Sequence, residues 1–381
     1  MDIPTFEELF KQIKLNLWFF GIPFNGRKIE LRFYFMVVVV IIMLIGEISF
    51  FVSRYAPENF MELTQLASCI CVGALSLLKI LPIAHKKQKI FELTESLDGL
   101  YNTILENPKK KAIIRRQMIL VKILMKYLFI VNIALFVIYN ISPLIFMTYN
   151  YIETNEVEFI LPFALGVPFS IESMATWFPV YAYSVFSSFV SVSYFVTVDA
   201  LYCILTTHIC SNLSMVSEEL QNVDTSNEDE LKELVKNHQY ILKLSENLEE
   251  IFSLPNLFNV MMSSLEICAV GFNLTMGPVS EIPRSVVFLS SVLLQILMLS
   301  VFGEKLIEES TKVGDAAYNS KWYEVDQKTK KTILIIMTRS SKPQQLTAYK
   351  FSVISYGSFT KIISTSWSYF TILKTVYKPP E

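Results

Sequence analysis

The segment that decides the fold is Phe33–Ser53, which reads FYFMVVVVIIMLIGEISFFVS. It holds 21 residues and a single charge, Glu47. A helix needs about 20 mostly apolar residues to cross the hydrocarbon core of a bilayer, and this run has that length. It lacks the alternation of apolar and polar residues that marks a strand of a membrane barrel. The segment therefore predicts a transmembrane α-helix.

Six further stretches of the 381-residue chain have the same character. The second is interrupted only by Lys79, and the fourth has no charge before Asp199. Together the stretches predict seven transmembrane helices, at about residues 33–53, 63–83, 119–152, 173–198, 251–276, 285–303 and 351–373. The predicted fold class is all-α, a polytopic membrane protein.

The overall composition agrees with this class and excludes several others. The chain is 52% hydrophobic and 18% charged, whereas soluble domains are about 25% charged. A net charge of −2 argues against a basic nucleic-acid binder, so we expect no nucleic-acid partner. The abundance of apolar residues excludes a disordered chain. Residues 1–14 mix acidic and basic residues without an apolar centre, so we expect a cytosolic N-terminus and no signal peptide.

Lys and Arg are distributed unequally between alternate connections. Of the 33 basic residues, 28 lie in segments 1–32, 79–126, 207–255 and 303–350, and the other connections hold four. By the positive-inside rule the first set is cytoplasmic, which predicts a cytoplasmic N-terminus and an extracellular C-terminus. This orientation is opposite to that of a G-protein-coupled receptor. A re-entrant pairing of the fourth and fifth segments would change it, but basic and non-basic connections alternate at every step.

The polar connection 207–255 contains a predicted helix. Apolar residues in its second half recur near a 3.6-residue period, and Ser226 with Asp229, or Asn227 with Glu230, has the spacing of a helix cap. We expect this helix to continue into the fifth span. Its apolar stripe needs a partner, which is either another cytoplasmic helix of the same chain or a second subunit.

The outer connection 150–174 contains four Glu, no Lys or Arg, and two Pro that each precede a Phe. These features predict an ordered lid. The chain then divides into a cytoplasmic N-terminal segment at 1–32, helices 1–4 at 33–206 with the lid at 150–174, a cytoplasmic helical connection at 207–255, helices 5–6 at 251–303, a cytoplasmic anchor segment at 304–350 and helix 7 at 351–377.

Residues for catalysis or metal binding are not grouped in the sequence. The five Cys lie in or beside predicted spans, and their odd number argues against a disulfide framework. The three His have no acidic neighbours at metal-ligand spacing, and neither a Gly-rich phosphate loop nor a Gly-x-Ser-x-Gly motif occurs. We therefore expect no enzyme activity, no cofactor and no metal.

The last third of the chain carries four short motifs. They are YKFS at 349–352, TSWSYFTIL at 365–373, AYNSKWY at 317–323 and SSLEICAVGF at 263–272. With the length, the span count and the inverted orientation, they resemble the insect odorant receptor family. Gustatory receptors and the co-receptor usually carry a Gln after a Thr-Tyr pair in the last helix, and the corresponding stretch here has none. The resemblance thus implies a ligand-tuning odorant receptor rather than the co-receptor.

The resemblance implies a heterotetrameric, non-selective cation channel, formed with the co-receptor in the plasma membrane of sensory neurons and opened by a small volatile apolar molecule. The last helix would line the pore, and the outer constriction falls on Ile372 and Val376, with Thr375 beside them. A ring of such apolar side chains can close a pore by dewetting. Close helix packing also explains the many Ser and Thr of this span. Lys361 departs from the family pattern, and either snorkels to the interface or pairs with Glu266.

The family's ligand site lies in the outer half of the bundle, between the second, third, fourth and sixth helices. No motif fixes its positions, so we assign them by helical spacing, and plain bundle packing is the alternative for each. We expect an apolar cavity of about 300–1,000 Å³. The expected lining residues are Cys69, Ile70, Gly73, Phe136, Tyr139, Asn140, Trp177, Tyr181, Phe288, Ser291 and Gln295.

Two other functions remain as alternatives, a gustatory-type receptor channel and a secondary transporter. A transporter predicts inverted repeats and ion-binding acids at broken helices in the membrane midplane. The sequence shows no inverted repeat, and the two acids within the spans, Asp199 and Glu266, stand alone. A metabotropic receptor would carry its basic connections on the opposite side of the membrane.

Overall fold

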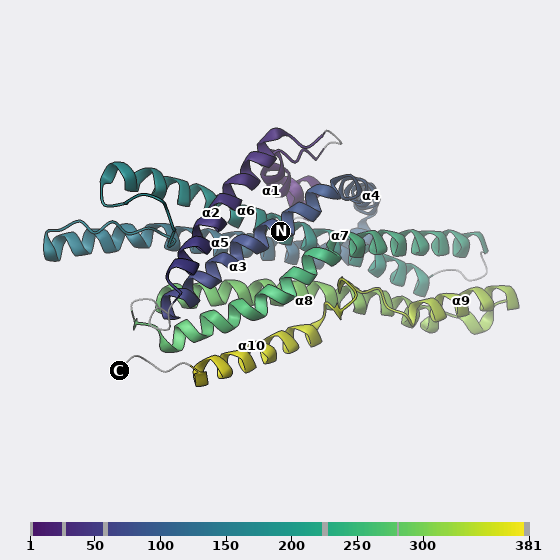
Figure 1. Ribbon diagram of the computed structural model, residues 1–381. Coiled ribbons are helices and arrows are strands. Elements are labelled where there is room, and N and C mark those ends of the chain that lie inside the picture. The colour runs from purple at the N-terminus through teal and green to yellow at the C-terminus, as the bar shows by residue number, and fades with distance from the viewer. Residues whose placement is uncertain (1–2, 25–27, 56–59, 223–227, 280–281, 377–381) are drawn as a thin grey trace.

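The computed structural model describes residues 3–24, 28–55, 60–222, 228–279 and 282–376. Long helices lie side by side, and α10 runs along one edge of the molecule (Figure 1). The elements are α1 (Phe6–Phe19), α2 (Leu31–Ser53), α3 (Phe60–His85), α4 (Lys87–Glu106), α5 (Pro108–Thr154), α6 (Met174–Asn222), α7 (Glu228–Met276), α8 (Ile282–Asn319), η3 (Trp322–Glu324), α9 (Gln327–Ser340), β1 (Thr347–Ala348), β2 (Ser352–Val353) and α10 (Tyr356–Val376).

Six helices of the described part are long and apolar enough to cross a membrane, namely α2, α3, α5, α6, α7 and α8. Their positions agree with the first six predicted spans. The last helix, α10, has 21 residues but does not belong to this set, because its many Ser and Thr lower its hydropathy. The seventh span and the orientation of the two termini stay predictions.

Several helices extend well beyond the membrane. The helices α5, α6 and α7 contain 47, 49 and 49 residues, which at about 1.5 Å per residue is about 70 Å, more than twice the thickness of bilayer hydrocarbon. The connection between α5 and α6 lies at one end of the molecule, and α9 with the first turns of α7 lies at the other (Figure 1). This separation agrees with the alternation of connections in the sequence.

The predicted helix of the 207–255 connection is the first half of α7. It continues through Pro255 without a break to Met276, while the proposed cap residues Ser226 and Asn227 lie outside the described residues. Most of the stripe is buried in one apolar cluster with residues of α4, α6 and α8 of the same chain, so the first of the two alternatives for its partner is the one observed. The buried stripe residues are Leu231, Leu234, Ile241, Leu242, Leu248 and Phe252.

The last helix begins later than predicted. Residues 351–355 were expected to form its first turn, but β1 pairs there with β2 in an antiparallel hairpin, and α10 starts at Tyr356. Tyr349 and Lys350 in the intervening turn have φ angles of 50° and 64°. This left-handed conformation is incompatible with a continuing helix, so the YKFS motif forms a turn and not a helical start.

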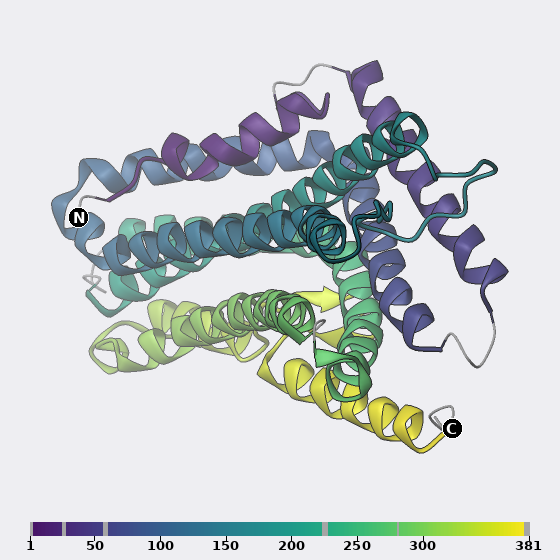
Figure 2. The same cartoon turned by 90° about the vertical axis from the view of Figure 1, so that its left-hand side faces the viewer.

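The same hairpin ties α10 to α7. The Thr347 hydroxyl donates to Glu249 Oε1 over 2.6 Å, and the Tyr349 N–H donates to the Ser253 carbonyl over 3.0 Å. Figure 2 shows the hairpin between the end of α9 and the start of α10, next to α7. The start of the last helix is therefore anchored to α7.

A buried ion pair joins α3 to α6. Lys79 Nζ lies 2.9 Å and 3.0 Å from the two carboxylate oxygens of Asp199, and 3.6 Å from the centre of the Phe195 ring. Both charged side chains are almost fully buried. The expectation that Asp199 stands alone was wrong, because its partner lies 120 residues away in the chain and only helix packing brings the two together.

The suggested pairing of Lys361 with Glu266 is not formed. Glu266 on α7 is fully buried and has no hydrogen-bond partner among the described residues. Lys361 on α10 is exposed, which agrees better with the snorkelling alternative.

Removing one member of the Lys79–Asp199 pair should destabilise the fold, because the remaining charge stays buried without compensation. We predict a loss of about 3–5 kcal/mol for Asp199→Leu, and at least partial recovery in the double variant Lys79→Met/Asp199→Leu. Thermal unfolding of the purified protein in detergent measures both. The control is the exposed Lys89–Glu250 pair, where Lys89→Met should lower the free energy of unfolding by less than about 1 kcal/mol. A double variant no more stable than Asp199→Leu would contradict this account.

Candidate ligand-binding site

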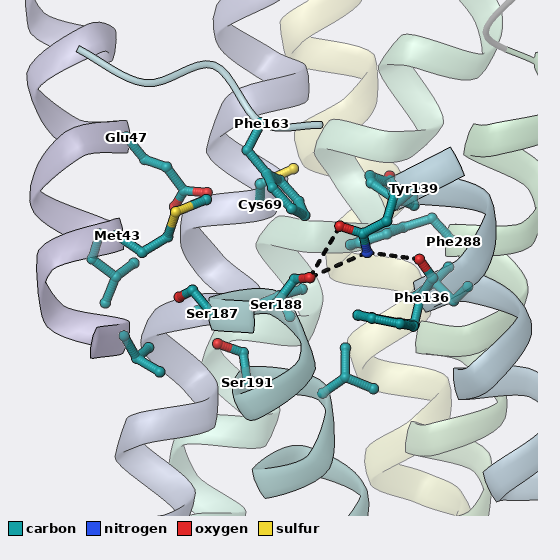
Figure 3. Close-up of a pocket in the computed structure, with 17 residues that line it drawn as sticks. Met43, Glu47, Cys69, Phe136, Tyr139, Phe163, Ser187, Ser188, Ser191 and Phe288 are labelled. Carbon is teal, nitrogen blue, oxygen red and sulfur yellow. Dashed lines mark hydrogen bonds between the residues drawn. The ribbon is translucent and has the colours of Figure 1, made fainter. Parts of the chain in front are cut away.

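Five helices and the lid line a cavity of about 70 Å³. Its walls come from α2, α3, α5, α6 and α8, and Phe163 of the lid closes it (Figure 3). The side chains are mostly apolar, as expected of a site for a small organic molecule. The lining residues are Val40, Met43, Leu44, Glu47, Cys69, Val72, Gly73, Leu135, Phe136, Tyr139, Asn140, Phe163, Ser187, Ser188, Ser191, Val192 and Phe288.

Tyr139 organises the aromatic part of the cavity. Its ring centre lies 6.1 Å from that of Phe163, with nearly parallel planes, and 6.0 Å from that of Phe288. The Arg284 guanidinium carbon lies 3.9 Å from the same ring, and Arg284 Nη2 donates to the Pro162 carbonyl over 3.1 Å. Lid, α5 and α8 thus meet at a single tyrosine.

Three polar side chains, Asn140, Ser187 and Ser188, interrupt the otherwise mostly apolar lining. Asn140 Nδ2 donates to the Phe136 carbonyl over 2.7 Å and to Ser188 Oγ over 3.1 Å. The neighbouring Ser187 hydroxyl is buried and has no hydrogen-bond partner among the described residues. Glu47 projects from α2 on the opposite side (Figure 3). The cavity therefore offers one buried hydroxyl that is available to hydrogen-bond with a ligand.

Two glycines let the lid lie directly on α2. The Gly166 N–H donates to the Gly46 carbonyl over 2.9 Å. A Cβ atom on Gly166 would lie 2.9 Å from the Phe50 backbone nitrogen, closer than such atoms approach without a shift of the chain. The next lid residue inward, Leu165, is buried against α2. The contact holds the lid closed over the cavity.

The expected lining residues divide into two groups. Six of them line the cavity, namely Cys69, Gly73, Phe136, Tyr139, Asn140 and Phe288. The other five, Ile70, Trp177, Tyr181, Ser291 and Gln295, do not line it. Gln295 instead donates from Nε2 to Asn259 Oδ1 of α7 over 2.9 Å.

Trp177 and Tyr181 support the site from outside. Their rings stack with centres 4.8 Å apart. Trp177 Nε1 donates to the Ile160 carbonyl of the lid over 2.9 Å, and the Tyr181 hydroxyl donates to the Asn140 carbonyl over 2.6 Å. This aromatic pair fixes the lid and α5 relative to α6.

Sequence reasoning missed the contribution of α2 and the serines of α6. Two signals were available, since Glu47 is the only charge in the first span, and Ser187 and Ser191 are spaced to share one face of an apolar helix.

The cavity volume of about 70 Å³ is well below the expected 300–1,000 Å³, because side chains from six segments pack closely against one another. A ligand must displace some of them to enter.

The last helix shows two different faces. It packs against α7 and α8 and buries Ser358, Ile362 and Ser366, which recur every four residues and so form one stripe. Several of its hydroxyls donate to carbonyls one turn earlier in the same helix, for example Ser366 to Ile362 over 2.8 Å. The buried face therefore needs no polar partner from another helix.

The expected gate residues lie near the end of α10. Ile372 is 60% exposed, and Thr375 is exposed, with its hydroxyl donating to the Thr371 carbonyl over 2.7 Å. Val376 is the last residue of the helix, and its side chain lies outside the described residues. Ile372 and Thr375 leave α10 with an accessible apolar and hydroxylated surface at this end.

A model of the 7tm odorant receptor family matches residues 59–367, which is most of the chain. The chain belongs to the odorant receptor family. The putative odorant receptor 92a of Drosophila melanogaster is 27% identical over 398 residues, covering 99% of this chain and 97% of that protein. Odorant receptor 67c of the same organism is 32% identical over 189 residues, covering 48% and 47%.

The fold of this odorant receptor is also that of a solved relative. The structure of the insect olfactory receptor OR5 from Machilis hrabei in complex with eugenol covers 97% of both chains with a TM-score of 0.84, at 16% identity. The all-α fold and the family inferred from the motifs are thereby confirmed. The protein is a multi-pass membrane receptor for small volatile ligands, and the gustatory and transporter alternatives are not favoured.

The lid contact generates a test. We predict that Gly166→Ala weakens the closed lid by about 1–3 kcal/mol, the usual cost of overpacking. Modification of Cys69, which lines the cavity, by a small uncharged maleimide should then accelerate by about tenfold. Gly99→Ala is the matched control, because a Cβ there meets nothing within 4 Å, and Cys69→Ser identifies the reporter. Equal rates in the two glycine variants would show that the contact does not hold the lid.

Proposed function

We propose that this odorant receptor is the ligand-tuning subunit of a ligand-gated, non-selective cation channel. It would assemble with the co-receptor into a heterotetramer in the plasma membrane of sensory neurons, with its N-terminus in the cytosol. The observation that carries the proposal is the lidded cavity, because it combines aromatic walls and a free hydroxyl with a wall from α8, a helix that packs against α10.

The cavity favours a small, mostly apolar ligand with one hydrogen-bonding group. Tyr139, Phe136 and Phe288 supply aromatic surface, and Ser187 supplies the hydroxyl. The Machilis hrabei structure is a complex with eugenol, which is a small aromatic molecule with a hydroxyl group. By analogy, phenols and aromatic esters are the first ligands to test.

One apolar cluster connects the cavity to the last helix. Phe288 and Tyr139, which line the cavity, belong to a cluster that continues through Val292 of α8 and Val270 of α7 to Ile362 of α10. A ligand that pushes Phe288 outward must repack this cluster, since protein interiors have few voids to absorb the movement. The cluster thus supplies a route from ligand binding to the pore helix.

The pore itself is proposed at the exposed end of α10. Four copies of this helix around an axis would present Ile372 to the ion path, and Val376 one turn further on. Apolar rings of this kind close a pore by excluding water. The accessible hydroxyl of Thr375 is suited to a cation path once the rings separate.

The cavity is tested by filling it. We predict that Ser187→Leu, which occupies the space beside Asn140, abolishes the odorant-evoked current or raises the odorant concentration needed for a half-maximal current. The expected rise is at least about tenfold, equivalent to about 1.4 kcal/mol of lost binding. The measurement is the current in excised patches without nucleotides, after co-expression with the co-receptor and application of a panel of volatile aromatics.

Ser290→Leu is the matched control, since Ser290 lies on the exposed side of α8 and should leave the response unchanged. Surface expression of both variants is measured in parallel. An unaltered response in Ser187→Leu would remove the ligand from this cavity, and a strict requirement for a G protein would refute the channel.

The gate is tested by making it polar. We predict that Ile372→Ser raises the basal conductance by at least about fivefold, equivalent to about 1 kcal/mol, because a wetted ring no longer closes the pore. Leu373→Ser is the control, because it lies about 100° around the helix. Equal basal currents in the two variants would place the constriction elsewhere.

A further inference from the structure

A second, separate hollow lies between α1, α5 and α6. It has a volume of about 370 Å³. Leu15, Trp18 and Phe19 of α1 form one wall, Phe129 and Ile133 of α5 form the other, and Phe189 of α6 also lines it. Leu15, Trp18 and Ile133 are each more than half exposed. We name this hollow the α1–α5 groove.

The two walls of the groove carry matching stripes. Glu8, Gln12, Leu15 and Phe19 are spaced by four, three and four residues on α1, and Lys122, Lys126, Phe129 and Ile133 are spaced in the same way on α5. Residues at such spacing share one face of a helix. Each stripe is therefore polar at its first two positions and apolar at its last two, and of the polar positions only Gln12 lines the groove.

An ion pair fixes the polar end. Lys122 Nζ lies 3.0 Å from Glu8 Oε2, which neutralises this lysine. Lys126, one turn further toward the apolar end, is exposed and forms no ion pair among the described residues. A positive charge is thus left over beside the groove, where the α5 stripe changes from polar to apolar.

Three of the four polar side chains that line the groove, Gln12, Asn16 and Asn132, are already hydrogen-bonded. Asn16 Nδ2 donates to Thr197 Oγ1 over 2.9 Å, and Asn132 Nδ2 donates to the Leu128 carbonyl over 2.9 Å. The apolar end therefore accepts an occupant that makes no hydrogen bonds. An amphiphile with one anionic group and a flexible hydrocarbon chain has this pattern.

The groove lies at the level of the membrane boundary. Phe129 and Ile133 belong to the inner end of the third predicted span, and Lys122 and Lys126 precede its charge-free part. Exposed Trp18 beside these residues is typical of the membrane–water interface. In the proposed orientation this is the cytoplasmic leaflet.

We propose that the α1–α5 groove binds one phospholipid of the cytoplasmic leaflet, with an acyl chain between Leu15 and Ile133 and the phosphate beside Lys126. The acyl chain leaves the hydrocarbon of the bilayer for an equally apolar groove, so it contributes little to the choice between lipids. The headgroup therefore decides which phospholipid binds. An anionic phospholipid is favoured over a zwitterionic one.

The bound lipid would adjoin the ligand cavity. Val192 lines both the cavity and the groove. The Phe189 ring meets Phe19 of α1 edge-on at 6.0 Å, and meets Phe136 of the cavity at 6.1 Å. One layer of side chains therefore separates lipid from ligand, so lipid occupancy should alter odorant sensitivity. This last step rests on the proposed function.

The test is photolabelling of the full-length receptor in nanodiscs of phosphatidylcholine with a small fraction of phosphatidylserine that carries a diazirine on its acyl chain. Peptide mapping should find the label on Leu15–Phe19 and Phe129–Ile133. Ser193→Trp, which fills the groove, should reduce this label by at least about tenfold. Lys126→Gln should reduce it by about fivefold, the value of one basic residue at an anionic surface.

Ile130→Trp is the matched control, because Ile130 is 49% exposed on α5 but does not line the groove; it should keep the label. Label that survives Ser193→Trp, or lies evenly over the outer face of α5, would overturn the proposal. Labelling needs no odorant, so its failure is distinct from failure of the channel proposal, which is read from currents.

Discussion

The ion pair of Lys79 with Asp199 constrains how α3 packs on α6, and the ligand cavity depends on that packing. Two charges within a bilayer are tolerated only when each finds its partner, so a slip of one helical turn would leave both uncompensated. Gly73 lies six residues from Lys79, and Ser191 lies eight from Asp199, about 9 Å and 12 Å along their helices. The Lys79–Asp199 ion pair thus fixes the relative position of α3 and α6, which form the inner walls of the cavity. The lid and α2, in contrast, are held by apolar contacts and single hydrogen bonds, such as those at Ile160, Pro162 and Gly166 of the lid, each of which costs less to break than the buried ion pair. We therefore expect the walls from α3 and α6 to stay in place when a ligand binds, and the lid and α2 to move.

This asymmetry explains how a closed cavity can gate a channel. At about 70 Å³ the cavity must expand to receive a ligand, and its fixed inner walls direct the expansion toward the lid and toward Phe288. From there the apolar cluster reaches Ile362 on α10. Moving a pore from 1% to 99% open requires about 5.5 kcal/mol of differential affinity. Expansion consumes part of the binding energy of a small molecule, which favours modest affinity and tuning to a chemical class, since an apolar pocket distinguishes one methylene by about 1–3 kcal/mol.

Much of this architecture could be predicted from the sequence. The apolar runs predicted α2, α3, α5, α6, α7 and α8, because hydrocarbon forces the backbone into helices. Helical spacing also identified Phe136, Tyr139 and Asn140 on one face of α5. Other features depend on rotation and contact, which one sequence does not encode locally. Trp177 and Tyr181 lie on a helix that lines the cavity, but Trp177 turns toward the lid and Tyr181 toward α5; Phe163 reaches the cavity from an irregular segment. Asp199 finds its partner only through tertiary packing, and the β1–β2 hairpin took the place of the helical turn expected at 351–355.

A structure of the assembled channel with a bound odorant, determined by electron cryo-microscopy, tests the central claim most directly. The account predicts ligand density between Phe136, Tyr139 and Phe288, a larger cavity with a displaced lid, and a shifted Ile362 on α10. Ligand density at another site, or a filled cavity in an open channel whose Phe288 and Ile362 have not moved, would contradict it.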